Sequence, residues 1–142
     1  MRSLVEATPA EGILDGPICD RLPLKSWSQG RVTLLGDAAH PMSPSVAQGA
    51  NSTFEDAYEL ALCCSQASSI QEALARYEQR RIPRTQLMQT RSALGEMGYD
   101  ATDREAADKQ MQEQSQMSRE EFEDWAFNYK PEVKFDYNYS SL

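Results

Sequence analysis

The sequence predicts a mostly helical α/β fragment, and two features support this prediction. The first is the apolar run from Val32 to Leu35, which lacks alternation with polar residues and ends at Gly36, as is typical of a strand buried on both faces. The second is the set of amphipathic segments after it, which open with the Ser-x-x-Glu pattern of a helix N-terminus. We therefore expect one strand, then a loop, then several helices.

Before this strand the sequence predicts only short extended pieces. Ile13-Leu14 and residues 17–21 flank Asp15-Gly16, a dipeptide that favours a tight turn, so they are expected to form one or two short strands. Residues 22–30 then form a connector, in which Trp27 is expected to be a packing residue.

The loop after the strand is stiffened by prolines. Residues 39–49 include Pro41 and Pro44, and they carry no acidic or basic side chain apart from His40. We expect His40 to pack within this loop. Gly49, at its end, allows another group to approach the backbone closely.

The helix after the loop is expected to begin with a capping box formed by Ser52 and Glu55. Glu55 and Asp56 would also favour this end of the helix through its dipole, and that role is sufficient to explain them. Its predicted apolar face comprises Phe54, Ala57, Tyr58, Ala61 and Leu62. The first N–H groups of the helix would point back at the loop, an arrangement that suits an anionic or electron-rich ligand group.

A second helix is expected from Ser69, which forms another Ser-x-x-Glu pattern with Glu72. Pro83 interrupts its helical pattern, so a kink or a restart is predicted there, and Gly95 and Gly98 are expected to end the region.

The remaining residues give a weaker signal. Residues 102–117 are polar nearly all round, which indicates a solvent-facing helix or a partly disordered segment. A third capping box at Ser118 opens a short helix with an apolar edge of Phe122, Trp125 and Ala126. The aromatic residues of 128–142 suggest that this end docks on the body of the protein.

Composition excludes several classes of function. The net charge of −8 argues against a nucleic-acid partner, since phosphate binding needs a basic face. His40 is the only histidine, so no metal site is predicted, and no G-x-S-x-G motif indicates a hydrolase. The three cysteines lack a framework spacing and are expected to be buried free thiols in a reducing compartment. No segment approaches the length of a membrane span, so a cytoplasmic protein is expected.

The string GDAAHPMSPSVAQGAN, followed by Glu-Asp-Ala, carries a family resemblance. It resembles the second FAD-binding motif of the flavin-dependent aromatic hydroxylases, the single-component FAD monooxygenases. The residues that match run from Gly36 to His40, then Pro44, Gln48-Gly49, Asn51 and residues 55–57. The sequence departs from the family pattern at Ala47, where the family usually has Gly. The family's Tyr-Glu-x-x-Arg-x-Pro-Arg segment is also matched, at residues 77–84, and its arginines are expected to bind carbonyl groups and acids of the same domain.

The resemblance implies an arrangement of domains. It covers roughly Ile18 to Met97, which corresponds to only the C-terminal part of a longer enzyme. Residues 1–30 would be the end of the substrate-domain sheet and a crossover, residues 31–98 the C-terminal part of a Rossmann-like FAD-binding domain with one returning strand, and residues 99–142 a helical extension with an aromatic tail. No GxGxxG motif follows an N-terminal strand, so the chain looks like a fragment or one half of a split protein. An N-terminal Rossmann half would be its partner.

The resemblance also implies the residues that bind FAD. Asp37 would hydrogen-bond the ribityl chain, although a cap on the following turn is an alternative role. Pro44 would lie against the isoalloxazine ring. The N–H groups of Gly49, Ala50 and Asn51 would face the pyrimidine edge of the flavin. Arg21 is expected to form a surface ion pair or a sheet-edge contact; the alternative is a role at the flavin or the domain junction.

The implied activity is hydroxylation or epoxidation of a small organic, often aromatic, substrate with O₂ and NADH or NADPH. No catalytic side chain is identifiable, and the isolated chain is expected to be incomplete and inactive. Two alternatives remain open: an FAD-dependent dehydrogenase or reductase without oxygen transfer, and a truncated non-catalytic interaction module.

Overall fold

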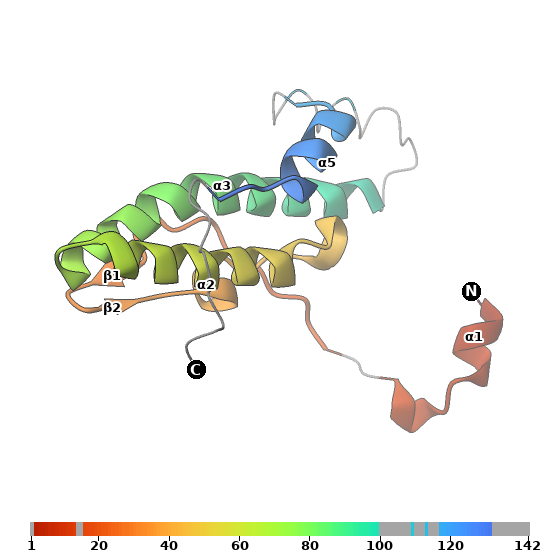
Figure 1. Cartoon of the computed structure of the whole chain (residues 1–142). Coiled ribbons are helices and arrows are strands. Elements are labelled where there is room, and N and C mark those ends of the chain that lie inside the picture. Colours follow the sequence, from red (N-terminus) through yellow and green to blue (C-terminus); the bar gives the residue numbers. More distant parts are fainter. Residues whose placement is uncertain (1, 14–15, 100–108, 110–112, 114–116, 132–142) are drawn as a thin grey trace, which may run out of the picture.

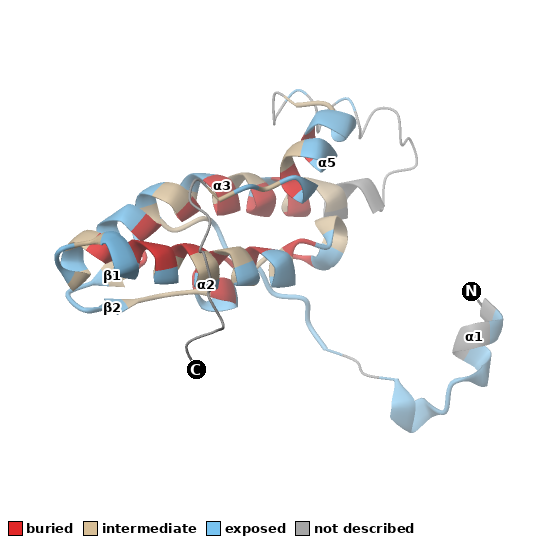
Figure 2. Cartoon of the chain, viewed as in Figure 1, coloured by how far each residue is buried: buried red, intermediate tan, exposed pale blue. Residues whose placement is uncertain are grey.

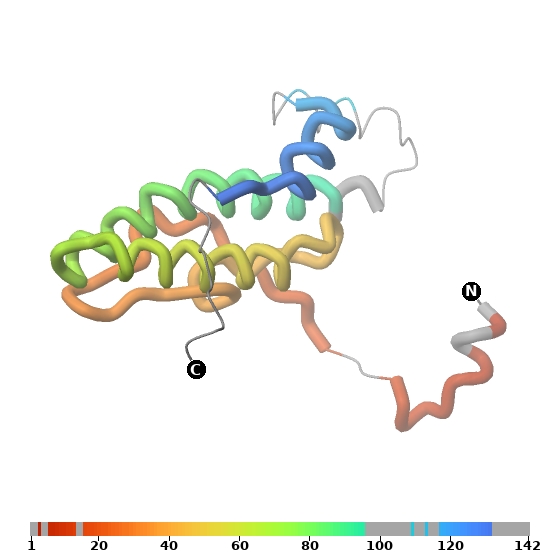
Figure 3. The backbone as a smooth tube through the Cα atoms, in the orientation of Figure 1, coloured from red at the N-terminus to blue at the C-terminus, as the bar shows by residue number. Residues whose placement is uncertain are grey.

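The computed structural model describes residues 2–13, 16–99, 109, 113 and 117–131. Two long helices, α2 (Gly49–Gln66) and α3 (Ile70–Tyr99), lie side by side and form the body of the protein (Figure 1). The short strands β1 (Ser28–Gln29) and β2 (Val32–Thr33) form an antiparallel hairpin beside them, and helix α5 (Arg119–Phe127) crosses the later part of α3. The path of the backbone is clearest in Figure 3, where the segment that contains α1 (Arg2–Ala7) extends away from this body.

Buried residues lie along the facing sides of α2 and α3 (Figure 2). The apolar face predicted for α2 is largely wrong, because Phe54, Ala57 and Ala61 are exposed. The buried residues of α2 are mainly polar or charged: Ser52, Asp56, Glu59, Leu62 and Cys63. This choice of face follows from α3, which presents arginines to the acids of α2 and so makes their burial possible.

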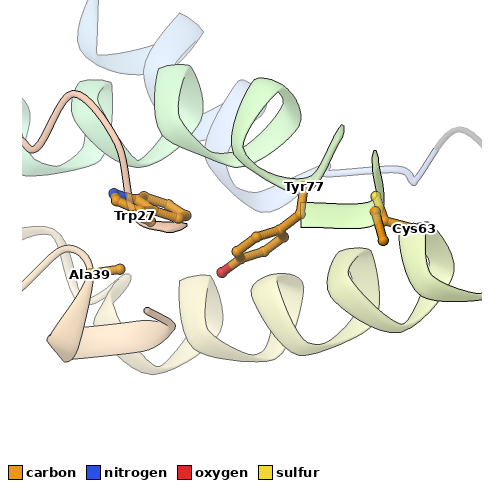
Figure 4. Close-up of a cluster of buried hydrophobic side chains, with 5 residues drawn as sticks. Trp27, Ala39, Cys63 and Tyr77 are labelled. Atoms are coloured by element: carbon orange, nitrogen blue, oxygen red, sulfur yellow. The ribbon is translucent and has the colours of Figure 1, made fainter. Parts of the chain in front are cut away.

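A small apolar cluster closes the end of the helix pair near the hairpin. Trp27, Ala39, Cys63, Ala73 and Tyr77 form this cluster, and Figure 4 shows the Trp27 and Tyr77 rings between α2 and α3. The centroids of these two rings are 5.5 Å apart in a tilted arrangement. Trp27 is therefore a packing residue, as predicted. The main-chain N–H of Trp27 donates to the Glu78 carboxylate of α3 at 2.8 Å, which fixes the connector to the helix.

The predicted strand is shorter and more exposed than expected. Only Val32 and Thr33 of the apolar run are in a strand, and the side chain of Val32 is 70% exposed. The expectation that this strand is buried on both faces is therefore wrong for the described part of the chain. Val32 is exposed and Thr33 is half-buried, so one face of β2 lies open in the described part of the chain, and β1 pairs only along its edge.

The N-terminal residues do not form the predicted short strands. Ile13 and residues 16–21 have no strand in the structure, and residues 14–15 lie outside the described part. Instead, α1 is followed by a single 3₁₀ turn, Ala10–Gly12. Short extended pieces need a neighbouring strand to satisfy their N–H and C=O groups, and the described residues offer them none.

Helix α3 continues through Pro83, so of the predicted kink or restart the restart does not occur, and the kink stays a prediction. Gly95 lies inside the helix rather than at its end. Residues on both sides of the proline are held by ion pairs: Arg81 with Asp56, and Arg84 with Glu55. At the start of α3 the Ser69 hydroxyl accepts from the Glu72 N–H at 3.2 Å, as predicted, but the Glu72 carboxylate binds the Ser68 N–H instead of completing the box.

Helix α5 begins with the predicted capping box of Ser118 and Glu121, which is confirmed. Phe122 and Ala126 are buried on its apolar edge. Of the C-terminal aromatic residues, Tyr129 docks as expected, because its hydroxyl donates to Glu59. Residues 132–142 and most of 100–116 lie outside the described residues.

Two further expectations concern the whole described chain. Cys63 is buried and free, as predicted, whereas Cys19 and Cys64 are exposed, so that prediction holds for one thiol of the three. Among the described helices, none combines the length and the apolar character that a membrane span requires.

Candidate functional site

The loop between β2 and α2 is the candidate site. It contains two 3₁₀ turns, Gly36–Ala38 and Pro44–Val46, and it leads directly into α2. Gly36 has a φ of +60°, and a Cβ atom there would lie 2.9 Å from the Thr53 hydroxyl oxygen. Only glycine therefore fits where the loop meets the first turns of α2.

The five predicted cofactor-binding residues are all accessible. Asp37, Pro44, Ala50 and Asn51 are exposed, and Gly49 is half-buried. The loop is anchored by other side chains, which are buried: His40, Ser43 and Gln48. Such a loop presents its predicted binding residues outward while its inner side chains fix its conformation.

Helix α2 begins four residues earlier than the predicted capping box required, because its N-cap is Gln48 and not Ser52. Gln48 makes no side-chain cap hydrogen bond, and the first backbone bond runs from the Ser52 N–H to the Gln48 carbonyl at 2.8 Å. Ser52 is inside the helix, so the capping-box prediction is wrong. Because the first turn of a helix has no intrahelical partner for its N–H groups, those of Gly49, Ala50 and Asn51 are available to a ligand.

A buried network below the loop centres on Asp56. One carboxylate oxygen accepts from the Gly36 N–H at 3.0 Å and contacts His40 Nε2 at 2.5 Å, and the other accepts from Arg81 Nε at 2.7 Å. Burial raises the pKa of Asp56, but the hydrogen bonds from His40 and Arg81, the Arg81 charge and the Gly36 N–H together hold it below its usual value. The network thus ties the start of the loop to both long helices.

Glu55 and Asp56 are therefore more than favourable charges at a helix end, which corrects the role predicted for them. Glu55 binds Arg81 Nη1 at 2.8 Å and accepts two hydrogen bonds of 2.7 Å from the Arg84 guanidinium. Burial lowers the pKa of Arg81, but Asp56 and Glu55 raise it above its ordinary value overall. The expectation that arginines of α3 bind acids and carbonyl groups is confirmed, while their shared domain stays a prediction. The packing role of His40 is also confirmed, because its ring lies 5.5 Å from that of Trp27.

Sequence reasoning missed this network, although a signal for it existed. Ser52, Asp56 and Glu59 share one face of α2 by their spacing, Arg81 and Arg84 share one face of α3, and Arg80 lies at the edge of that face, four residues before Arg84. Such matching runs of acids and arginines on consecutive helices predict a polar interface between them.

Arg21 also supports the loop. Its guanidinium donates to the Ala38 carbonyl at 2.5 Å and to the Ala39 carbonyl at 2.9 Å. These contacts differ from the expected surface ion pair or sheet-edge contact. They join the N-terminal connector to the loop next to Asp37.

The Pro44 turn packs closely on α3. Ser43 Oγ donates to the Ser92 carbonyl at 3.1 Å, and a Cβ atom at Gly95 would lie only 2.9 Å from the Ser45 side chain. Ala47, which closes the turn, has left-handed backbone angles, φ 52° and ψ 30°. This is the position where the family usually has Gly, and a Gly would adopt these angles without strain.

The described residues contain no group of three or more His, Cys, Asp or Glu side chains that could hold a metal ion. The site consists of backbone N–H groups, one accessible carboxylate and a rigid support. It can bind and orient a polar ligand.

Comparison with known proteins places the loop and the helix pair within a known family. Residues 20–92 match the FAD binding domain family. The chain is 48% identical over 81 residues to the aurachin C monooxygenase/isomerase of Stigmatella aurantiaca, and this match covers 57% of this chain and 21% of that protein. It is 38% identical over 121 residues to a 3-amino-4-hydroxybenzoate 2-monooxygenase of Streptomyces platensis, and this match covers 84% of this chain and 30% of that protein.

A third relative is the 3-hydroxybenzoate 6-hydroxylase 1 of Aquipseudomonas alcaligenes, 49% identical over 75 residues, or 53% of this chain and 19% of that protein. The chain thus spans less than a third of the length of these relatives. The match includes the whole loop and most of the helix pair. The chain belongs to the FAD binding domain family, within the superfamily of FAD-dependent aromatic hydroxylases and monooxygenases.

Proposed function

We propose that this chain supplies the part of an FAD-dependent monooxygenase that holds the ribityl and isoalloxazine portion of FAD. The observation that carries the proposal is the open N-terminus of α2 beside the accessible Asp37, both fixed by the buried Asp56 network. FAD fits this donor set, because its ribityl hydroxyls can donate to a carboxylate and its pyrimidine carbonyls can accept from N–H groups.

Each of the five predicted residues has a role in this proposal. The Asp37 carboxylate accepts a hydrogen bond from the ribityl chain. The N–H groups of Gly49, Ala50 and Asn51 donate to the pyrimidine edge, where the positive end of the helix dipole favours negative charge. Pro44 packs beside the ring and excludes water from it.

Bound FAD supplies the redox chemistry, in which NADH or NADPH is the electron donor and O₂ the source of the oxygen atom. The substrate that we propose is a small organic molecule, often aromatic, which is hydroxylated or epoxidised. The relatives favour oxygen transfer over a dehydrogenase, because their names describe monooxygenases, a hydroxylase and zeaxanthin epoxidases. The residues of this chain bind and orient; we assign no catalytic side chain.

We further propose that an N-terminal Rossmann half with a GxGxxG motif completes the site. The exposed apolar residues Val32 of β2 and Phe54, Ala57 and Ala61 of α2 support this partner, because they offer an apolar surface that a sheet and its helices can cover. The isolated chain would then be inactive, since it would hold only one end of the cofactor.

The test is titration with FAD, followed by quenching of flavin fluorescence. The chain is measured alone and after co-expression with the N-terminal part of the Stigmatella aurantiaca relative, which precedes the matched segment. We expect binding by the pair, and about tenfold or more weaker binding after Asp37→Ala, because a hydrogen bond to a charged group contributes about 1.5–3 kcal/mol.

Asp124→Ala is the control, because Asp124 is an exposed residue of α5 and should leave the affinity unchanged. Failure of the pair to bind FAD, or equal affinities for the Asp37 variant and the parent, would contradict the proposal. NADH or NADPH consumption that is matched by hydroxylated product would separate a monooxygenase from a dehydrogenase.

A further inference from the structure

Buried polar side-chain atoms in the described residues nearly all have a hydrogen-bond partner, and the exceptions are few. They are His40 Nδ1, Gln48 Nε2, Ser52 Oγ and Arg91 Nε. Gln48 stands out among them because it is the N-cap residue of α2, at the candidate FAD site, while its side chain is only 2% exposed.

The orientation of the Gln48 amide follows from its neighbours. Its side-chain oxygen accepts from Asn51 Nδ2 at 3.4 Å, so the amide lies against the first turn of α2. The Gln48 main-chain carbonyl is used by the Ser52 N–H. The NH₂ group is therefore the unused part of this residue, and Gln48 directly precedes Gly49, Ala50 and Asn51, whose main-chain N–H groups open α2.

Gln89 provides a contrast in the same protein. It is also buried, at 6% exposure, but its NH₂ group donates to the Arg21 carbonyl at 3.2 Å and the Pro41 carbonyl at 3.0 Å. A buried NH₂ group without a partner lowers the stability of the folded state, so a protein that retains one needs another favourable interaction to offset that loss. At a ligand site that interaction is a hydrogen bond to the ligand.

We infer that the side-chain amide of Gln48 recognises the bound ligand by donating a hydrogen bond to it, in addition to the hydrogen bonds from the three main-chain N–H groups. A ligand edge that meets several donors at one helix end carries several acceptor atoms, as the pyrimidinedione edge of a flavin does. The inference deepens the proposed function and rests on it, since it takes FAD as the ligand. It makes Gln48 a specificity-determining residue through its side chain, in addition to its main-chain role as N-cap.

The test compares Gln48→Met with Gln89→Met, in which a side chain of similar volume replaces each amide. Affinity for FAD is measured on the chain paired with its N-terminal partner, and thermal unfolding is measured without FAD. For Gln48→Met we expect the Kd for FAD to rise about threefold to tenfold, with a Tm equal to or above that of the parent. For Gln89→Met we expect a Tm lower by about 5 °C, because two buried carbonyl groups lose their donor.

A higher Kd without a lower Tm for Gln48→Met, beside a lower Tm for Gln89→Met, distinguishes a ligand contact from a structural role. A Gln48→Met variant that unfolds at a lower temperature, as Gln89→Met is expected to, would show that the Gln48 amide has a partner inside the protein, and the inference would fail. An unchanged Kd would also overturn it, and would assign the amide to an ordered water molecule. If the parent pair binds no FAD, the proposed function fails as well, whereas an unchanged Kd in a parent pair that does bind FAD rejects only the role of Gln48.

Discussion

Ala47 has a backbone conformation that is unfavourable for a residue with a Cβ atom. Its left-handed angles, φ 52° and ψ 30°, cost an L-residue about 1–2 kcal/mol. We expect Ala47→Gly to stabilise the protein by about 0.5–1 kcal/mol, since the relief of strain exceeds the extra conformational entropy of glycine in the unfolded chain. Urea unfolding of the two proteins measures the difference.

Ala57→Gly is the matched control. Ala57 is exposed in the middle of α2, where glycine should destabilise by roughly 0.5–1 kcal/mol. Loss of stability in both variants would show that the backbone at residue 47 is not left-handed in solution.

Asp56 joins three elements, the loop, α2 and α3, so its effect belongs to the scale of elements. Asp56→Asn removes the charge that pairs with the fully buried Arg81, and we expect a loss of about 3 kcal/mol near neutral pH. Urea unfolding curves of the parent and the variant, recorded between pH 3 and pH 7, measure the difference in free energy of unfolding at each pH.

The pH dependence of this loss has a definite sign. The pKa of Asp56 in the folded protein lies below its ordinary value of 3.8, so the unfolded chain binds the proton first as the pH falls. The stabilisation is therefore fully present above that value and declines as the pH falls below it toward the folded-state pKa. The gap between parent and variant should narrow there. Glu123→Gln is the control: it breaks an exposed pair with Arg119 and should cost under about 1 kcal/mol of stability at every pH. If the difference in stability between the parent and Asp56→Asn does not vary with pH, the role given to Asp56 is contradicted.

These elements also show what the sequence could and could not predict. The order of strand, loop and helices was predictable, because the apolar run, the prolines and the Ser-x-x-Glu patterns are local signals. The start of α2 at Gly49 was not, since an uncapped helix end leaves no mark on the sequence. The buried face of α2 was also mistaken, because Asp56 and Glu59 are buried only through arginines that come more than twenty residues later.

At the scale of the whole molecule, the site residues were easier to locate than their support. Asp37, Pro44, Gly49, Ala50 and Asn51 came from a contiguous motif, and all five prove accessible, while their binding of FAD stays a prediction. The division into residues 1–30, 31–98 and 99–142 also stays a prediction. The contacts that hold the described part together are long-range: Arg21 on the loop, Asp56 on two helices and Arg84 on α5.

Arg84 is the link between the helix pair and the C-terminal segment. It binds Glu55 of α2 through two nitrogen atoms, and it donates to the main-chain carbonyls of Trp125 and Ala126 at 3.2 and 3.0 Å. Its guanidinium carbon also lies 4.3 Å from the centroids of both the Trp125 and the Tyr129 rings. Lysine keeps the charge but cannot reproduce a planar fork that stacks between two rings.

We therefore expect Arg84→Lys to release α5 and Tyr129 while α2 and α3 stay folded. Hydrogen exchange of the α5 amides should accelerate by about tenfold to a hundredfold, which corresponds to roughly 1.4–2.8 kcal/mol, whereas the amides in the middle of α2 should change little. Mass spectrometry of peptides from residues 118–129 and 52–66 measures both. Arg76→Lys is the control, because the Arg76 pair with Glu72 is exposed and lies within α3. Equal acceleration in both peptides would mean that Arg84 stabilises the helix pair itself, and no acceleration in α5 would mean that its apolar edge alone holds it in place.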